Sequence, residues 1–357
     1  MKIAQVAPLY ESVPPKYYGG TERIVSYLTE ELVKLGHDVT LFASGDSVTS
    51  ANLVSQCHRA LRLDKHSVDT IAHHVLMTER IYQRSSEFDV IHSHIDYFPF
   101  SMMRRIETPA ITTLHGRLDF EDLQPLYQEF SDIPLVSISD SQRAPLPQAN
   151  WKRTIYHGLP DDLYTFHELP GEYLAFLGRI CPEKRVDHAI EIAKRVDMKL
   201  KIAAKVDKVD EQYFSTMVKP LLDHPLIEYV GEIGETEKIT FLGNASALLF
   251  PIDWPEPFGL VMIEAMACGT PTIANWQGSV PEVIQQGVTG FAIQDIEQAV
   301  KAVEMIPSVS RRRCREVFEK RFTASRMAQD YLSVYQQLIE EKKRPDRIVQ
   351  EELQWMK

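Results

Sequence analysis

The sequence predicts an α/β protein built from two doubly wound domains, each a parallel sheet covered by helices. The chain has 357 residues, and at about 150 residues per domain this length suggests two cores. Short β-branched runs alternate with helical patterns, and this alternation starts twice along the chain. Alternation of this kind is typical of parallel sheets with helices on their faces. Ligands of such sheets bind at the carboxyl ends of the strands, so we expect a cleft there.

The N-terminal half carries the first set of alternating elements. A buried run at 3–8 predicts a strand, and residues 22–35 predict a helix with one apolar stripe. Gly36 ends that helix. Further strands are expected at 38–43, 89–93, 110–114 and 135–139.

The pattern then begins again. Strands are expected at 173–177, 199–204, 227–229, 247–250 and 272–274, and helices at 186–196 and 260–267. The segment 158–171, with its prolines and acidic residues, is the candidate linker, and the chain from about Thr323 is helical in pattern. We therefore expect an N-terminal domain at 1–165, a C-terminal domain at 166–325 and a terminal helix at 326–357.

Composition excludes several classes of protein. The 44% hydrophobic and 25% charged residues are ordinary for a globular chain, and no apolar run approaches the roughly 18 residues of a membrane span. The four cysteines form no CxxC pair, which argues against disulfides and structural zinc. The net charge of −11 disfavours nucleic acid as a partner. We expect a reduced, cytoplasmic protein without stable membrane association. The basic run 311–315 could contact anionic lipid, but a solvated helix face is the favoured interpretation.

The segment 254–271 is the most informative one for function. Glu256 precedes a predicted helix and Glu264 lies within it. Eight residues place the two carboxylates roughly 12 Å apart on one side of a helix. This spacing suits two hydroxyl-bearing ends of one elongated ligand better than a shared metal. Surface glutamates on a capped helix are the alternative.

Two other segments could contact a phosphate. Arg179 and Lys184 follow a predicted strand and could clamp a diphosphate, because arginine offers a planar fork of donors and lysine a compact charge. Gly19 and Gly20 open the first helix, whose N-terminus favours an anion. A solvated loop and a plain turn are the respective alternatives. Neither GxGxxG nor GxxxxGK[ST] occurs.

Histidines lie at two predicted strand ends. His115 follows the strand at 110–114, and His92 and His94 alternate near the end of the strand at 89–93. His94 and Asp96 could form an acid/base pair. No HExxH or GxSxG motif occurs, which argues against a zinc hydrolase or a serine hydrolase.

Taken together, these segments resemble the family 4 retaining glycosyltransferases with the GT-B fold. The resemblance covers nearly the whole chain, and the order and spacing of its pieces make it specific. The matching pieces are Gly19-Gly20-Thr21-Glu22-Arg23, residues 34–40, Ile91-His92-Ser93-His94, Thr113-Leu114-His115-Gly116, Gly178-Arg179, Glu183-Lys184, Glu256 with Glu264, and Gly278 with Pro281-Glu282-Val283.

The resemblance assigns roles to residues of a sugar-nucleotide donor site. It implies that Arg179 and Lys184 hold the donor diphosphate beside the Gly19-Gly20 backbone. Glu256 would contact the sugar hydroxyls, Glu264 the ribose and His115 the far end of the sugar. The remaining donor-binding residues are Gly231 and Ile233 near the base, with Phe258, Gly259 and Leu260 at the helix start.

The resemblance also implies the chemistry. Family members retain anomeric configuration, use no metal and need no cofactor beyond the donor. They are expected to react by front-face attack of the acceptor within an ion pair, and the lack of an evident enzyme nucleophile in this sequence agrees with that mechanism. The terminal helix would cross back to the first domain. His157 departs from the family, because many relatives carry Asn there, which leaves the contacts of the interdomain hinge open.

UDP-glucose is the expected donor, with GDP- and ADP-sugars as alternatives. Aromatic residues near strand ends of the N-terminal half would favour a planar acceptor such as a pterin, or else fill the core; they are Tyr10, Tyr17, Tyr18, Tyr97, Phe98, Phe100 and Phe120. Three other functions compete: a GT-B sugar-nucleotide epimerase, a noncatalytic sugar-nucleotide binder, and a nicotinamide oxidoreductase, which the absent glycine fingerprint disfavours.

Overall fold

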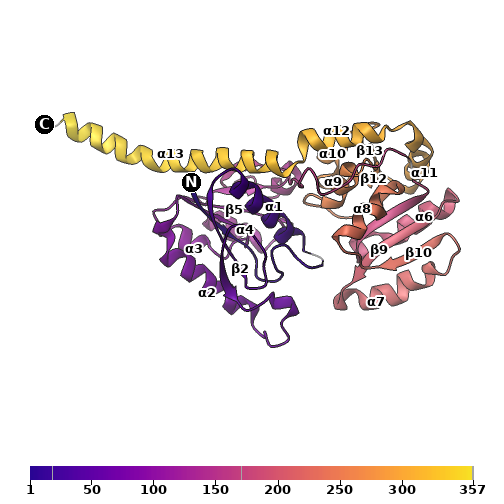
Figure 1. Cartoon of the computed structure of the whole chain (residues 1–357), viewed down its shortest axis with the longest axis horizontal. Helices are drawn as coiled ribbons and strands as arrows, with labels where there is room; N and C mark the ends of the chain where they lie inside the picture. Colours follow the sequence, from indigo (N-terminus) through magenta and orange to yellow (C-terminus); the bar gives the residue numbers. More distant parts are fainter. Residues whose placement is uncertain (18, 170, 356–357) are drawn as a thin grey trace. The chain divides into compact units, whose positions relative to one another are not determined.

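The structure, a computed structural model, describes residues 1–17, 19–169 and 171–355. The chain divides into two compact units (Figure 1). The first comprises residues 1–138 and 143–156 with the chain from 324 onward, and the second comprises 139–142 and 157–323. Each unit has its own parallel sheet, which confirms the expected fold class.

The sheet of the first unit has the strand order β3-β2-β1-β4-β5-β6-β7. All of its pairings are parallel, and the order reverses between β1 and β4, as in a doubly wound sheet. The strands are β1 (Lys2–Val6), β2 (Asp38–Ser44), β3 (Asn52–Cys57), β4 (Val90–Ser93), β5 (Ala110–Thr113), β6 (Leu135–Ser137) and β7 (Trp151–Thr154).

Helices cover both faces of this sheet. The core on one face joins β1, β4 and β5 to α2 (Thr70–Gln83), α3 (Phe100–Met103) and α4 (Leu123–Glu129). On the other face lie α1 (Gly20–Lys34) and the long α13 (Ala324–Trp355), which pack against each other (Figure 1). The predicted return of the terminal helix to the first domain is therefore confirmed.

The buried residues of α13 explain why it docks on the first unit. Side chains at helical spacing lie on one stripe and are almost fully buried; they are Met327, Ala328, Tyr331, Val334, Tyr335 and Leu338. Two of them are tyrosines, whose hydroxyls need partners when buried.

The second unit repeats the architecture with the strand order β10-β9-β8-β11-β12-β13. Its strands are β8 (Tyr173–Ile180), β9 (Leu200–Val206), β10 (Ile227–Gly231), β11 (Ala245–Phe250), β12 (Thr272–Asn275) and β13 (Gly290–Ile293). Its helices are α6 (Val186–Arg195), α7 (Glu211–Tyr213), α8 (Glu235–Gly243), α9 (Leu260–Ala267), α10 (Val280–Val283), α11 (Ile296–Met305) and α12 (Arg311–Arg321); α5 (Asp140–Arg143) lies where the chain passes between units.

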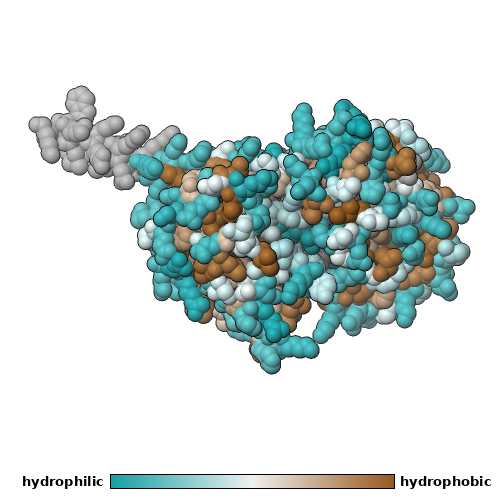
Figure 2. Space-filling model, in the orientation of Figure 1, coloured by the Kyte–Doolittle hydropathy of each residue, from teal (hydrophilic) through white to brown (hydrophobic). Residues whose placement is uncertain are grey.

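The hydrophilic surface and the free cysteines are those expected of a globular protein. On the face drawn in Figure 2, hydrophilic residues cover most of the surface and hydrophobic ones form scattered patches. Within the described residues, no helix combines the length and apolar character needed to cross a bilayer. The four cysteines are free thiols, three of them buried.

Candidate functional site

Arg179 is the penultimate residue of β8 rather than part of a loop after it. Its guanidinium is close to three carboxylates: Nη2 is 3.1 Å from Glu183, and Nη1 is 3.5 Å from Asp207 and 3.6 Å from Asp210. Lys205 adds a second cation, 2.9 Å from Asp207. The cluster therefore holds three carboxylates against two cations, and an anion that binds Arg179 has to compete with these carboxylates.

Lys184 is much less exposed than a surface clamp would be. It ends a 3₁₀ turn after β8, and its ammonium lies 5.1 Å from the ring centroids of both Phe250 and Trp254. It forms an ion pair with Glu256, and the two side chains are only 15% and 12% exposed. Trp254 Nε1 also donates to Glu256 Oε2, at 3.0 Å. Lys184 and Glu256, 72 residues apart in sequence, thus form one buried charged pair.

A tight turn behind Glu256 holds this segment in place. Gly278 has φ 54°, and a Cβ there would lie 2.3 Å from the carbonyl oxygen of Glu256, so only glycine fits. Ser279 N donates to Glu256 O at 3.0 Å, and Ser279 Oγ donates to Phe258 O at 2.8 Å. The short helix α10 continues from this turn.

Helix α9 begins at Leu260, immediately after Gly259, whose φ of 77° turns the chain into the helix. Its Glu264 is buried rather than a surface carboxylate, with 5% of its side chain exposed. Lys238 Nζ lies 2.9 Å from Glu264 Oε1, and the Tyr164 hydroxyl lies 3.0 Å from the same oxygen and 2.5 Å from Glu235 Oε1. Sequence reasoning missed both partners because they come from distant segments.

The other predicted residues of the second unit have simpler surroundings. Gly231 ends β10 with φ 81°, and Ile233 lies half-buried in the loop before α8. The Phe258 ring is buried against His157, at 4.8 Å between centroids. Its side chain therefore belongs to the core.

Gly19 and Gly20 begin α1 in the first unit. Gly19 is the N-cap and Gly20 the first helical residue; the neighbouring Tyr18 lies outside the described residues. Glu22, in the first turn, is 5% exposed. Burial raises its pKa to about 7, and repulsion from Glu11 adds to this increase.

His115 and His94 hydrogen-bond to each other, with 2.9 Å between His115 Nε2 and His94 Nδ1. The other ring nitrogen of His94 lies 2.9 Å from Gln5 Oε1. Both ring nitrogens of His94 thus have partners other than Asp96, to which the sequence had suggested a link. Asp96 itself is exposed to solvent.

Four rings form a continuous run near the carboxyl ends of β1 and β4. Tyr10 lies 4.8 Å from His74, His74 stacks on Phe98 at 5.6 Å, and Phe98 stacks on Tyr97 at 5.9 Å between centroids. Tyr10 and Tyr97 are 41% and 42% exposed. Of the remaining predicted aromatic residues, Tyr17 and Phe120 are exposed, whereas Phe100 is fully buried in the core.

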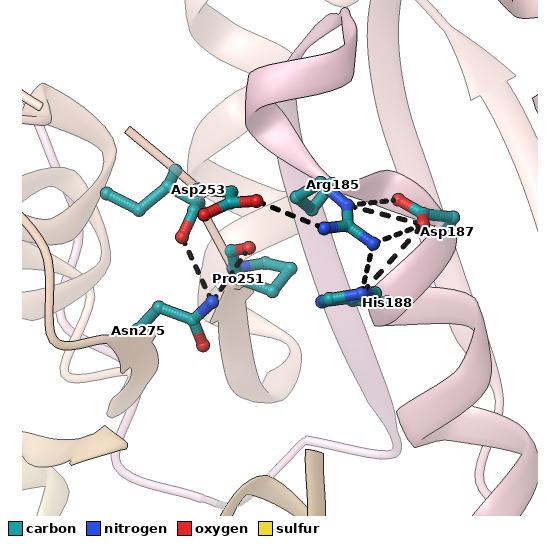
Figure 3. Close-up of polar contacts among 7 residues, drawn as sticks. Arg185, Asp187, His188, Pro251, Asp253 and Asn275 are labelled. Atoms are coloured by element: carbon teal, nitrogen blue, oxygen red, sulfur yellow. Dashed lines mark hydrogen bonds and ion pairs between the residues drawn. The ribbon is translucent and has the colours of Figure 1, made fainter. Parts of the chain in front are cut away.

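A pocket of about 360 Å³ lies between the starts of α6 and α11. Beside it, Arg185 bonds Asp187 and Asp253, while Asn275 Nδ2 donates to the carbonyl of Pro251 at 3.1 Å (Figure 3). The pocket is lined by His188, Ile192, Pro251, Asn275, Ile293, Gln294, Asp295, Ile296 and Glu297. This lining includes none of the predicted donor residues.

Among the residues that the structure describes, no group of three or more His, Cys, Asp or Glu side chains could hold a metal ion.

Comparisons with known families match both halves of the chain. Residues 18–155 match the model for "Glycosyltransferase Family 4", and residues 166–320 match the model for "Glycosyl transferases group 1". Glycogen synthase of Mycobacterium tuberculosis (strain ATCC 25618 / H37Rv) is 25% identical and aligns over 93% of this chain and 95% of its own length.

Solved structures share the fold. Sucrose-phosphate synthase from Thermosynechococcus elongatus superposes with a TM-score of 0.80 at 18% identity, covering 96% of this chain and all of the other. The Anabaena protein HepE, solved in complex with UDP-glucose, superposes with a TM-score of 0.73 at 15% identity, covering 94% of this chain and all of the other.

Proposed function

Because the chain belongs to the family 4 glycosyltransferases and has their GT-B fold, we propose that it transfers glucose from UDP-glucose to a hydroxyl of a small planar acceptor, such as a pterin, with retention. The observation that carries this proposal is the buried Lys184–Glu256 pair, with Arg179 in the strand that leads to it. Buried charges are costly unless they are paired.

The pair suits a ligand with a negative and a hydroxyl-bearing part. A diphosphate can take the place of Glu256 beside the Lys184 ammonium, because both are anions. The released Glu256 carboxylate then accepts hydrogen bonds from sugar hydroxyls. The Glu264 carboxylate, oriented by Lys238 and Tyr164, is suited to accept from the ribose hydroxyls.

The reaction needs only charge stabilisation and positioning from these residues. The bond between the anomeric carbon and the diphosphate oxygen breaks, and its electron pair leaves with the diphosphate. The acceptor oxygen bonds to the same face of the anomeric carbon, and its proton moves to the departing diphosphate. Arg179 and Lys184 stabilise the charge that develops there, and this role requires no metal ion.

Two observations support the donor and the acceptor. HepE, whose fold this chain shares, was solved with UDP-glucose bound. The ring run Tyr10, His74, Phe98 and Tyr97 offers partly exposed aromatic faces at the carboxyl edge of a parallel sheet, where a planar acceptor can stack.

Incubation with UDP-glucose labelled in the sugar tests this proposal. We expect slow release of UDP and glucose without acceptor, and faster UDP release with a glucosylated product when a pterin is added. GDP-glucose and ADP-glucose serve as comparison donors, and we expect slower release of their nucleotides than of UDP from UDP-glucose. Recovery of a changed sugar would indicate an epimerase, and retention of intact donor without turnover would indicate a binding protein; either outcome would refute the proposal.

A further inference from the structure

A buried polar cluster in the first unit connects α13 to His115. Gln5 on β1, His92 on β4 and Thr113 on β5 point to the same face of the sheet, since side chains alternate along a strand. That face is covered by α13, which contributes the hydroxyls of Tyr331 and Tyr335. Gln5, His92, Thr113 and both tyrosines are fully or almost fully buried.

Tyr335 is the branch point of the cluster. Its hydroxyl accepts a hydrogen bond from Gln5 Nε2 at 3.0 Å and lies 2.6 Å from His92 Nδ1. One branch continues from the Gln5 amide to His94 and then to His115. The other continues from His92 Nε2 to Thr113 Oγ1, at 2.7 Å, and from Thr113 to Tyr331 at 3.0 Å.

The chemistry of the groups fixes the direction of the first branch. Gln5 Oε1 is a carbonyl oxygen and can only accept, so His94 Nε2 carries a proton. Burial favours a neutral His94 ring, whose Nδ1 then accepts from His115 Nε2–H. Burial also lowers the pKa of His115 to about 3, so that ring is neutral. Its Nδ1 therefore carries a lone pair.

We propose that Tyr335 is a positioning residue that, through Gln5 and His94, holds His115 in the Nε2–H tautomer, so that Nδ1 accepts a hydrogen bond from a hydroxyl of the donor sugar. The link to the sugar rests on the proposed function; the proton arrangement itself rests on the contacts above. The terminal helix thereby helps to define the chemistry of a side chain at a strand end.

The Gln5 amide is the element that Tyr335 controls. The hydroxyl accepts from Nε2 and so holds the amide with its oxygen toward His94. Without the hydroxyl, Gln5 Nε2 loses its shorter contact and keeps the longer one to His92 Nδ1, at 3.5 Å, so the orientation of the amide is held less firmly. The flipped amide, with Nε2 donating to His94, then becomes accessible, and the tautomers of His94 and His115 reverse.

Tyr335→Phe tests the proposal, with Tyr331→Phe as the matched control on the same buried stripe. Tyr331 contacts Thr113, on the far branch. Long-range ¹H–¹⁵N spectra of the full chain labelled in histidine report each tautomer, and the spectrum of His115→Ala assigns the His115 signals. We expect His115 to carry its proton on Nε2 in the wild type, to shift toward Nδ1–H in Tyr335→Phe, and to stay unchanged in Tyr331→Phe.

Donor kinetics give the second measurement. Tyr335→Phe should raise the KM for the donor by about tenfold, the scale of one hydrogen bond, and Tyr331→Phe should leave it within about twofold. An Nδ1–H tautomer of His115 in the wild type, or equal shifts of the tautomer in both variants, would overturn the proposal that Tyr335 sets the tautomer of His115 through Gln5 and His94. Unchanged donor kinetics in His115→Ala, with the tautomer shifts as expected, would overturn the contact between His115 and the sugar. The control of the His115 tautomer by Tyr335 would remain supported.

Discussion

Replacing Lys184 by Met removes the charge of the buried Lys184–Glu256 pair while keeping most of the side-chain volume against Phe250 and Trp254. If Lys184 lay in a solvated loop, the alternative that the sequence leaves open, such a change would alter stability by no more than about 1 kcal/mol. The structure predicts a larger loss, because Glu256, only 12% exposed, would keep its charge and lose its cation.

The magnitude follows from burial. Breaking a fully buried pair by removing one partner costs about 3–5 kcal/mol. Lys184 and Glu256 retain some exposure, and Trp254 still donates to Glu256, so we expect a loss of about 2–4 kcal/mol in the free energy of unfolding. Replacing Glu256 by Gln as well removes the stranded charge and should restore about 1–3 kcal/mol of that loss.

Urea unfolding of the wild type, Lys184→Met and the double variant measures this coupling, provided that the m values agree. Lys201→Met is the matched control. Lys201 lies in the same unit, over the ring of Tyr173, and its partner Glu228 is 56% exposed; its loss should cost no more than about 1 kcal/mol. Equal effects of Lys184→Met and Lys201→Met would show that the Lys184–Glu256 pair is not buried as described.

Three further outcomes are expected. Glu264→Ala should raise the donor KM more than it lowers kcat, because ribose hydroxyls change little as the glycosidic bond breaks; steady-state kinetics check this. Activity should persist in excess EDTA, as measured by UDP release. The pKa of Glu22 is about 7 in the folded protein, above the ordinary value of 4.5 for a glutamate. The native state therefore binds an extra proton between these pH values, and the contribution of Glu22 to stability falls as pH rises. Relative to Glu22→Gln, the wild type should therefore lose about 3 kcal/mol of stability between pH 4.5 and 8.

Each of these outcomes can fail visibly. A fall in kcat without a change in donor KM would place Glu264 at the reacting bond instead of the ribose. Activity lost in EDTA and restored by Mg²⁺ or Mn²⁺ would remove the metal-free mechanism. Parallel stability curves for the wild type and Glu22→Gln, from urea unfolding at several pH values, would show that Glu22 does not keep its proton.

The sequence predicted the central strands well because they are buried on both faces and carry continuous apolar runs. It missed β3, β7 and β13, which are edge strands. The β7 sequence, Trp151–Thr154, carries two charged residues among its four, and β3 is exposed at two of its six positions. β3 and β7 therefore lack the buried pattern from which a strand is recognised, whereas β13 is buried at three of its four positions and was missed despite that pattern.

The site was predictable in its residue types but not in its pairings. Periodicity placed Glu256 before a helix and Glu264 within it, and the structure agrees. Spacing could not show that Lys184 meets Glu256 or that Lys238 meets Glu264, because tertiary packing brings distant segments together. Whether the predicted residues bind a sugar nucleotide stays a prediction.

UDP release from UDP-glucose by Arg179→Ala, compared with Arg195→Ala, tests the central claim most directly. Arg195 lies in the same unit and also bonds two carboxylates, Glu191 and Glu297. If Arg179 stabilises the departing diphosphate, kcat/KM should fall by ~10²–10³ in Arg179→Ala and remain near the wild-type value in Arg195→Ala. A fully active Arg179→Ala variant would contradict the assignment of this cluster as the donor site.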